Sequence, residues 1–253
     1  MKIAMITGAT SGFGEETAKQ LAEIGYNVIG TGRRNDRLEL LKKEIETRYK
    51  VEFLPLCFDV RKPKEVEKSI LTLPEKWKNI DILVNNAGLA SGLGSIQDGN
   101  IDDWDKMIDT NVKGLLYVSK FVIPMMIKLQ KGHIVNIGSI AGKQVYENGN
   151  VYCATKHALD ALTKSMRIEL YKHNIKVTAI HPGMAETEFS LVRFNGDETR
   201  AKKVYEGLEA LQAPDIADAI KYVVTRPHHV NISDMLIMPT NQADMNNILR
   251  KNK

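Results

Sequence analysis

The chain has 253 residues, and its 35 basic and 31 acidic side chains leave a net charge of only +4. This length suits one α/β domain with a large buried core. Because it has no dense block of Lys and Arg and no apolar run of ~18 residues, we expect no nucleic-acid partner and no membrane span. Cys57 and Cys153 are the two cysteines, and we expect free thiols, no signal peptide and a cytoplasmic location.

Strand and helix patterns alternate along the chain. The expected order begins with strand 2–7, helix 17–24, strand 26–31, helix 34–49, strand 51–58 and a helix that opens at Pro63. It continues with strand 80–84, a helix over 101–130 bent at Pro124, strand 133–137, helix 150–173, strand 175–180, helix 214–224 and strand 235–238. Residues 183–207 lack clean periodicity and are predicted to form a substrate lid, followed at 240–253 by a C-terminal tail.

This alternation predicts an α/β fold in which residues 1–253 form a single Rossmann-type domain, a doubly wound parallel sheet of about seven strands with helices on both faces. In such a sheet, ligands bind beyond the carboxyl ends of the strands. Candidate binding residues directly follow the predicted strands, namely Gly8, Arg33, Asp59, Asn86, Ser139 and Pro182. We therefore expect one site along this edge.

The first of these positions belongs to a glycine-rich turn, residues 7–14, with the sequence TGATSGFG. Its glycines permit a tight strand–helix turn and a close approach of the backbone to a phosphate. The helix N-terminus beyond offers unpaired N–H groups to an anion. The spacing differs from the Gly-x-Gly-x-x-Gly form of the dinucleotide fingerprint, so the motif alone also fits a turn that binds no ligand.

The end of the second strand, GTGRR at residues 30–34, indicates which dinucleotide binds. NAD-selective sites place an acid there to accept a hydrogen bond from the ribose 2′-hydroxyl, and this chain has glycine instead. Guanidinium binds phosphate through forked hydrogen bonds, so Arg33 is the first candidate for a 2′-phosphate and Arg34 the second. The alternative is that both arginines are solvated surface charges.

Tyr152 and Lys156 are four residues apart in a predicted helix, a spacing that places both side chains on one face. A nearby ammonium favours the phenolate and is expected to lower the pKa of the tyrosine. Such a tyrosine can exchange a proton with an alcohol or a carbonyl, and Ser139 is a candidate to hydrogen-bond the same substrate oxygen. The structural alternatives are a buried aromatic for Tyr152 and a strand-end cap for Ser139.

Together these motifs resemble the short-chain dehydrogenase/reductase family, in its single-domain branch, over residues 3–239. They comprise TGxxxGxG at 7–14, NNAG at 85–88, Asn111, Ser139, YxxxK at 152–156 and PG at 182–183. The resemblance implies hydride transfer with NADP and four catalytic residues. Tyr152 would be the general acid/base, Lys156 its partner and a ligand of the nicotinamide ribose, Ser139 the substrate contact, and Asn111 the anchor of a water for proton relay.

The resemblance also implies the residues that bind the cofactor. Asp59 with Val60 would contact the adenine, and residues 86–88 would back the adenosine ribose, although a loop-capping role for Asn85 and Asn86 can coexist with this. The full set is Gly8, Thr10, Ser11, Gly12, Phe13, Gly14, Arg33, Arg34, Asp59, Val60, Asn86, Ala87, Gly88, Tyr152, Lys156, Pro182, Gly183 and Thr187.

Within the family, the chain is most similar to the NADP-dependent 3-hydroxy acid dehydrogenases, in segments 103–111, 188–194, 229–232 and 238–239. This resemblance implies oxidation of the β-hydroxyl of serine, allo-threonine, 3-hydroxybutyrate or 3-hydroxypropionate, the reverse reduction of oxo acids or semialdehydes, and a homotetramer. Such a small-molecule substrate carries a carboxylate. Arg193 in the lid is the first candidate to bind it and Lys143 the second, whereas a lid–core or subunit salt bridge is the alternative for Arg193.

Two positions depart from this subgroup. Gln144 lies in the loop 143–147 where a bulky aromatic is expected, and His181 stands where an acid is expected. Substrate preference therefore stays open, with an NADPH-dependent reductase of 3-oxoacyl or other carbonyl compounds as the alternative enzyme and a non-catalytic NADP-binding regulator as the alternative class. The adjacent His228 and His229 lack partnering ligands, so no metal site is expected.

Overall fold

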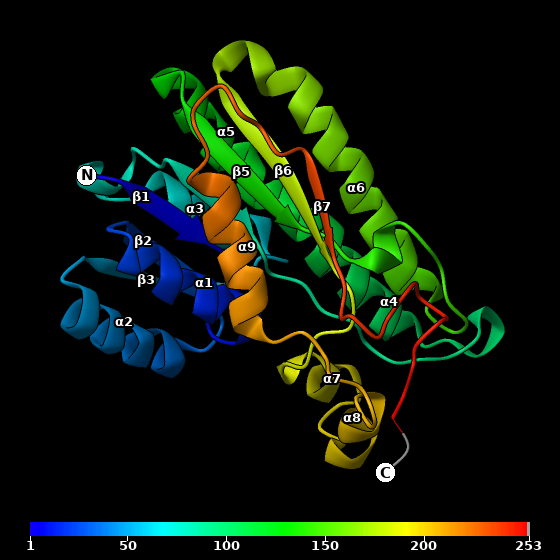
Figure 1. Cartoon of the computed structure of the whole chain (residues 1–253). Helices are drawn as coiled ribbons and strands as arrows, with labels where there is room; N and C mark the ends of the chain where they lie inside the picture. The colour runs from blue at the N-terminus through cyan, green and yellow to red at the C-terminus, as the bar shows by residue number, and fades with distance from the viewer. Residues whose placement is uncertain (252–253) are drawn as a thin grey trace.

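The computed structural model describes residues 1–251, and its strands form one parallel sheet in the order β3-β2-β1-β4-β5-β6-β7 (Figure 1). The strands are β1 (Ile3–Ile6), β2 (Asn27–Gly32), β3 (Phe53–Cys57), β4 (Ile82–Asn85), β5 (Gly132–Ile137), β6 (Ile175–Pro182) and β7 (Asp234–Ile237). The predicted doubly wound sheet is confirmed. Its strand order reverses between β1 and β4, and open sheets of this kind bind ligands at that point.

Helices cover both faces of the sheet (Figure 1). One face carries α1 (Gly12–Glu23), α2 (Asn35–Tyr49) and α9 (Ala213–Val224), and the other carries α3 (Pro63–Leu71), α5 (Leu115–Leu129) and α6 (Asn150–Leu170). The helix α4 (Ile101–Ile108) packs against α6. Two short helices, α7 (Glu188–Arg193) and α8 (Glu198–Val204), lie beyond the strand ends.

The strands are apolar because both of their faces are covered. In β1, Ile3 and Met5 pack in the cluster with α3, α5 and α6, whereas Ala4 and Ile6 pack in the cluster with α1, α2 and α9. All four side chains are completely buried. Because successive buried side chains point to opposite faces, the register of each strand is fixed. Functional side chains can therefore gather in the loops at the strand ends.

The predicted helix over 101–130 is interrupted. It consists of α4, a π-helical segment at Asp109–Gly114 and α5. Pro124 lies inside α5, and the irregularity comes ten residues or more before it. A π-helical turn inserts an extra residue into a helix and often occurs at a functional site. Here the segment contains Asn111, one of the predicted catalytic residues.

The largest of the other differences from the sequence prediction concern the first helix and the lid. The first helix begins at Gly12, inside the glycine turn and five residues earlier than expected. The lid, residues 183–207, contains α7 and α8, of six and seven residues. Helices of this length are shorter than the window of about 11–18 residues over which a helical pattern can be recognised, so the sequence did not reveal them.

The C-terminal tail, as far as residue 251, contacts the lid near its end. Arg250 donates hydrogen bonds to the carbonyls of Val204 and Glu206, and the Lys251 amide donates to Gly207. The tail therefore braces the lid from outside, and residues 252–253 of the predicted tail lie outside the described residues. Among residues 1–251, no helix combines the length and the apolar character needed to cross a membrane.

Candidate active site

A cavity of about 550 Å³ opens at the carboxyl ends of the strands, between the glycine turn and the lid. The structure places most of the predicted site residues on its wall. They are Gly8, Thr10, Ser11, Gly12, Phe13, Arg33, Arg34, Asp59, Val60, Asn86, Ala87, Gly88, Ser139, Tyr152, Lys156, Pro182, Gly183, Thr187 and Arg193. Gly14, Asn111 and Lys143 are the predicted residues that do not line it.

The glycine turn requires its glycines for two different reasons. Gly8 and Gly12 have φ angles of +69° and +54°, a left-handed conformation that favours glycine. Gly14 has no such angle, but a Cβ atom there would overlap the Gly8 carbonyl and the side-chain amide of Asn86. Gly14 thus lets α1 approach the turn closely, although it does not itself reach the cavity.

Asn86 fastens the glycine turn to the loop that follows β4. Its Nδ2 donates to the carbonyls of Thr7 at 2.9 Å and of Gly8 at 3.2 Å. In return, the Thr7 hydroxyl accepts hydrogen bonds from the backbone N–H groups of Asn86 and Ala87. The loop-capping role considered for Asn86 is therefore present, and the same residue also lines the cavity.

The two candidate arginines are held differently. Arg34 donates to the Thr10 and Ser11 hydroxyls and forms an ion pair with Glu188 of the lid, at 3.0 Å. The guanidinium of Arg33 lines the same end of the cavity and makes no hydrogen bond or ion pair within residues 1–251. Arg33 is thus available to an incoming anion, whereas Arg34 holds the turn and the lid together.

Asp59 also has a structural partner. Its carboxylate accepts hydrogen bonds from Arg61 at 2.6 to 3.0 Å. Although burial raises the pKa of Asp59, the hydrogen bonds and charge of Arg61 hold it below the usual range. Arg61 lines the cavity beside Asp59 and was not predicted from the sequence.

The proposed acid/base residues meet at the inner end of the cavity. The Ser139 side chain lies near enough to the Tyr152 hydroxyl to lower the pKa of the tyrosine, and both residues line the wall. The Ser139 hydroxyl also accepts a hydrogen bond from the Ala141 N–H at 3.1 Å, the capping role that was the alternative for this residue. Lys156 is buried, with its Nζ 2.8 Å from the Ile137 carbonyl and 5.9 Å from the centre of the Tyr152 ring. The spacing of four residues thus brings the pair to one face of α6, as predicted.

The electrostatic expectation for this pair differs from the structure. Burial, with a smaller contribution from Tyr146, raises the pKa of Tyr152, and the nearby Ser139 hydroxyl and the charge of Arg193 offset this only in part. Burial also lowers the pKa of Lys156 to about 8. In this structure, desolvation therefore dominates both groups, and the predicted lowering of the Tyr152 pKa by Lys156 is not observed.

Asn111 is buried in the π-helical segment and lies behind the cavity wall. Its Oδ1 accepts from the Leu89 N–H at 2.8 Å, and its Nδ2 donates to the Leu89 carbonyl and to Thr155. Thr155 in turn donates to the Tyr152 carbonyl. The Asn111 side chain therefore ties the loop after β4 to α6, so a water-anchoring role would have to use its main chain.

The two candidates for a substrate carboxylate are separated by the fold. The Lys143 ammonium is paired with Asp160 and Asp234, at 2.8 Å each, away from the cavity. This geometry corrects the expectation that Lys143 binds substrate. Arg193 lines the cavity and stacks on the Tyr146 and Tyr152 rings, with its guanidinium carbon 5.5 Å and 5.9 Å from their centres.

Several cavity residues escaped the sequence analysis. Tyr146 lies in the cavity wall, and its hydroxyl accepts a 2.7 Å hydrogen bond from Arg193. Phe189 of the lid packs edge-on against Tyr152, with ring centres 5.6 Å apart. The hydroxyls of Thr31 and Thr110 are buried without a hydrogen-bond partner among the described residues. A buried hydroxyl without a partner beside a cavity could identify Thr31 and Thr110 as candidate binding residues. This signal can be read only once the fold is known.

The burial of Lys156 leads to a prediction about stability. The lowered pKa means that burying the charged ammonium costs about 3 kcal/mol of stability, and its hydrogen bond returns ~1 kcal/mol. Lys156→Met should therefore stabilise the fold by about 2 kcal/mol at pH 7 while abolishing activity. The gain should be complete below pH 8 and should disappear towards pH 10.5, because only the unfolded state then binds the proton. Thermal unfolding at several pH values tests this. Equal stabilities of the wild type and the Lys156→Met variant at pH 7 would contradict this prediction.

The fold and this site define a dinucleotide-dependent oxidoreductase, and the comparisons with known proteins agree. The chain belongs to the short-chain dehydrogenase family, whose model, described as short chain dehydrogenase, matches residues 2–196. A relative from Salmonella typhi, named NADP-dependent 3-hydroxy acid dehydrogenase YdfG, is 45% identical over 242 residues, which cover 95% of this chain and 96% of the relative. A Schizosaccharomyces pombe relative, named NADP-dependent 3-hydroxy acid dehydrogenase, is 42% identical over 99% of this chain and 97% of its own.

Solved structures show the same relationship. A closed form of serine dehydrogenase complexed with NADP⁺ superimposes with a TM-score of 0.91 at 42% identity, over 99% of this chain and all of the other. Serine dehydrogenase from Escherichia coli gives a TM-score of 0.82 at 39% identity, over 95% of this chain and 99% of the other. The chain therefore resembles these enzymes over 95% or more of its length.

Proposed function

We propose that this protein is an NADP-dependent dehydrogenase that oxidises the β-hydroxyl of small 3-hydroxy acids, of the serine or 3-hydroxybutyrate type, and reduces the matching oxo acids or semialdehydes. The observation that carries this proposal is Arg193, an arginine with no carboxylate partner among the described residues, in the same cavity as Ser139, Tyr152 and Lys156. The names of the relatives support the same activity.

The site fits the dinucleotide. The glycine turn brings backbone against the cavity, the N-terminus of α1 starts there, and the Thr31 and Thr110 hydroxyls lack a partner within residues 1–251. Arg33 would bind the 2′-phosphate, Asp59 and Val60 would face the adenine, and Lys156 would hold the nicotinamide ribose. When bound, NADP supplies the hydride acceptor, a chemistry that no side chain offers.

The protein's own groups would manage the proton and the orientation. Ser139 would hold the substrate oxygen beside the Tyr152 hydroxyl, which lies near it in the cavity wall. Tyr152 would accept the hydroxyl proton in oxidation and return it in reduction. Because the uncharged Tyr152 is favoured by burial, oxidation should accelerate as the pH rises.

Arg193 would orient the substrate through its carboxylate. Its Nε donates to the Gly92 carbonyl at 3.2 Å and one terminal nitrogen donates to Tyr146, so that the guanidinium is fixed over the Tyr152 ring. Within residues 1–251, no carboxylate neutralises it. A guanidinium can grip a carboxylate with two hydrogen bonds, and a fixed grip orients the reacting carbon.

Replacing Arg193 with Met tests this assignment, because Met keeps bulk and removes charge. We expect kcat/KM for serine or 3-hydroxybutyrate to fall by about ten- to hundred-fold, the loss of a charged hydrogen bond of about 1.5–3 kcal/mol. An uncharged secondary alcohol should lose much less. A uniform loss across charged and neutral alcohols would instead place Arg193 in lid folding or in a subunit contact.

Measurements of turnover distinguish the proposed activity from two other functions. A reductase of 3-oxoacyl or other neutral carbonyls would not need Arg193, and a regulator would bind NADP without turnover. The presence of Ser139, Tyr152 and Lys156 in one cavity favours an enzyme.

We also propose a homotetramer in the cytoplasm. Large apolar side chains remain exposed on α4, α5 and α6, among them Ile101, Leu116 and Ile168, and burial of such residues between copies would support assembly. Cys57 and Cys153 are both free thiols, as a reducing compartment requires. Light scattering of the purified protein tests the tetramer, since a monomeric mass would exclude it.

A further inference from the structure

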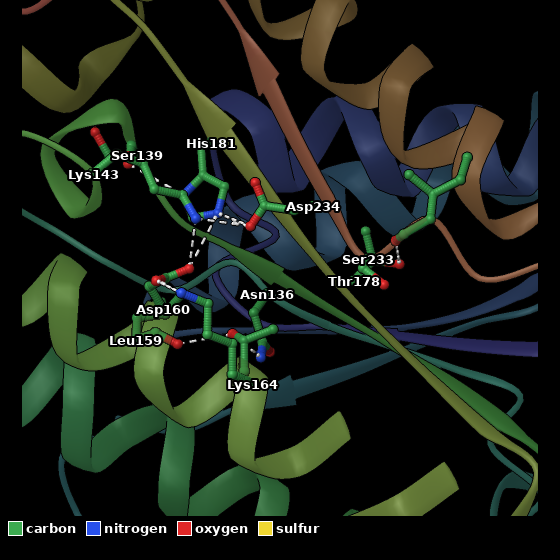
Figure 2. A network of polar contacts seen from close by, with 12 residues as sticks. Asn136, Ser139, Lys143, Leu159, Asp160, Lys164, Thr178, His181, Ser233 and Asp234 are labelled. Carbon is green, nitrogen blue, oxygen red and sulfur yellow. Dashed lines mark hydrogen bonds and ion pairs between the residues drawn. The ribbon is translucent and has the colours of Figure 1, made fainter. Parts of the chain in front are cut away.

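Two networks of charged side chains join distant segments of the chain. Figure 2 shows the first, where Asp160 and Asp234 face the buried ring of His181. Lys143 pairs with both carboxylates at 2.8 Å, and Lys164 pairs with Asp160 at 2.7 Å. None of these five residues lines the cavity. The first network thus pairs its charges among its own members, whereas the second reaches the cavity wall.

The second network joins the lid to the start of α2. Glu188, the first residue of α7, has a guanidinium against each of its carboxylate oxygens. Arg34 Nη1 lies 3.0 Å from Glu188 Oε2, and Arg37 Nη1 lies 2.6 Å from Glu188 Oε1. The two arginines precede Glu188 by 154 and 151 residues, so these contacts connect two separate parts of the fold. We call Glu188, Arg34 and Arg37 the Glu188 bridge.

The bridge should be stronger than a single surface ion pair. Burial raises the pKa of Glu188, but the hydrogen bonds from Arg37 and Arg34 hold it below its usual range, so the carboxylate is charged at neutral pH. An exposed pair is weak because two long side chains must lose their freedom. Here Arg34 is already fixed, since it also donates to the Thr10 and Ser11 hydroxyls at 2.9 Å. One carboxylate then binds two guanidinium groups, so less freedom is lost for each pair.

The two arginines relate differently to the cavity. Arg34 lines it beside Arg33, whereas Arg37 does not line it. The other hydrogen bond of the Arg37 side chain among residues 1–251 is a 3.4 Å contact with the Thr10 carbonyl. Arg37 can therefore influence a ligand in the cavity chiefly through Glu188.

The bridge fixes the part of the lid that meets the glycine turn. The side chain of Thr187, just before Glu188, lies so close to Gly12 that a Cβ atom added to this glycine would be 3.3 Å from it. Phe189, just after Glu188, packs edge-on against Tyr152, with ring centres 5.6 Å apart. The bridged segment therefore extends from the glycine turn to the candidate catalytic tyrosine, and all three of its residues line the cavity.

We propose that the Glu188 bridge is a latch, which holds the lid over bound NADP(H) and sets the rate of cofactor release. The inference rests on the proposed function, since it assumes that the cofactor lies between the glycine turn and the lid. Lid opening or product release limits turnover in many enzymes, and changes at a binding site mostly alter the dissociation rate. Glu188 and Arg37 are positioning residues, which act on the cofactor through the lid.

Removing the charge from either side of the bridge tests the latch. We expect Arg37→Gln to speed the release of NADPH by about three-fold and Glu188→Gln, which loses both pairs, by about ten-fold, with melting temperatures close to that of the wild type. The double variant should release NADPH as fast as Glu188→Gln alone, because the two residues share one interaction. Release is measured by stopped flow, from the loss of the fluorescence of bound NADPH when excess NADP displaces it.

Glu198→Gln is the matched control. Glu198 lies in α8 of the same lid and pairs with Lys202 of that helix at 3.3 Å, so its ion pair does not cross to the glycine turn. Its release of NADPH should match that of the wild type. An unchanged release rate in both bridge variants would overturn the proposal. Slower release in Glu188→Gln would also overturn it, because the carboxylate would then repel the cofactor phosphates instead of latching the lid.

Release of NADPH is measured without a substrate, so failure of the inference and failure of the proposed function are distinguishable. If the protein binds NADPH but oxidises no hydroxy acid, the proposed function is wrong, and the release rates still decide whether the latch exists. If hydroxy acids are oxidised and neither variant changes release, only the latch is wrong. The side chains of Arg37 and Glu188 are 41% and 39% exposed, so we expect both variants to fold, and either one decides if the other does not.

Discussion

Replacing Tyr152 with Phe should lower kcat by a factor of about 10² to 10⁴, the usual contribution of a general acid/base, and should leave NADP binding close to that of the wild type. The ring keeps its place in the wall, where it packs against Phe189 at 5.6 Å and under Arg193. Only the hydroxyl near Ser139 is lost. Steady-state kinetics and calorimetric titration with NADP measure the two quantities separately.

Tyr26→Phe provides a matched control. It removes a hydroxyl from a tyrosine just before β2, at the opposite end of the strands from the cavity. We expect its kcat to match that of the wild type. A Tyr152→Phe enzyme that keeps turnover within a few-fold of the wild type would contradict the mechanism.

Replacing Arg33 with Ala should raise the KM for NADP by about ten- to hundred-fold, the loss of a charge-assisted pair worth about 1.5–3 kcal/mol. The KM for NAD should hardly change, because NAD lacks the 2′-phosphate. The reason lies in the structure, where the Arg33 guanidinium has no partner within residues 1–251 and so binds nothing that the substitution would disturb. Kinetics with both cofactors check this result.

Arg34→Ala offers an informative comparison. Arg34 holds Thr10, Ser11 and Glu188, so its loss should loosen the glycine turn and the lid and weaken NADP and NAD alike. An Arg33→Ala variant that loses equally with both cofactors would place Arg33 in the same structural role and remove it from the phosphate site.

The sequence could assign most of the candidate residues to one cavity because of one property of parallel sheets. Their carboxyl ends meet at a single edge, so Gly8, Arg33, Asn86 and Ser139, which follow different strands, could be assigned to one cavity without knowledge of their contacts. The pair Tyr152 and Lys156 was predictable for a similar reason, since the helical period fixes which side chains share a face.

What the sequence could not predict depends on contacts between distant segments. Lys143 is paired with Asp234, 91 residues away, and this pairing holds it away from the cavity. The depth of burial of Tyr152 and Lys156, which controls their pKa values, is likewise a property of the packed fold. The π-helical segment around Asn111 has no pattern of its own, because its residues continue the helical spacing on both sides.

The most direct test of the proposed function is the absorbance of reduced nicotinamide, followed with the purified protein, NADP and a panel of serine, 3-hydroxybutyrate, 3-hydroxypropionate and uncharged secondary alcohols. We predict NADP reduction with the hydroxy acids, at a kcat/KM well above that for the neutral alcohols and with little activity when NAD replaces NADP. Turnover of neutral alcohols or of 3-oxoacyl compounds alone, or NADP binding without any turnover, would contradict it.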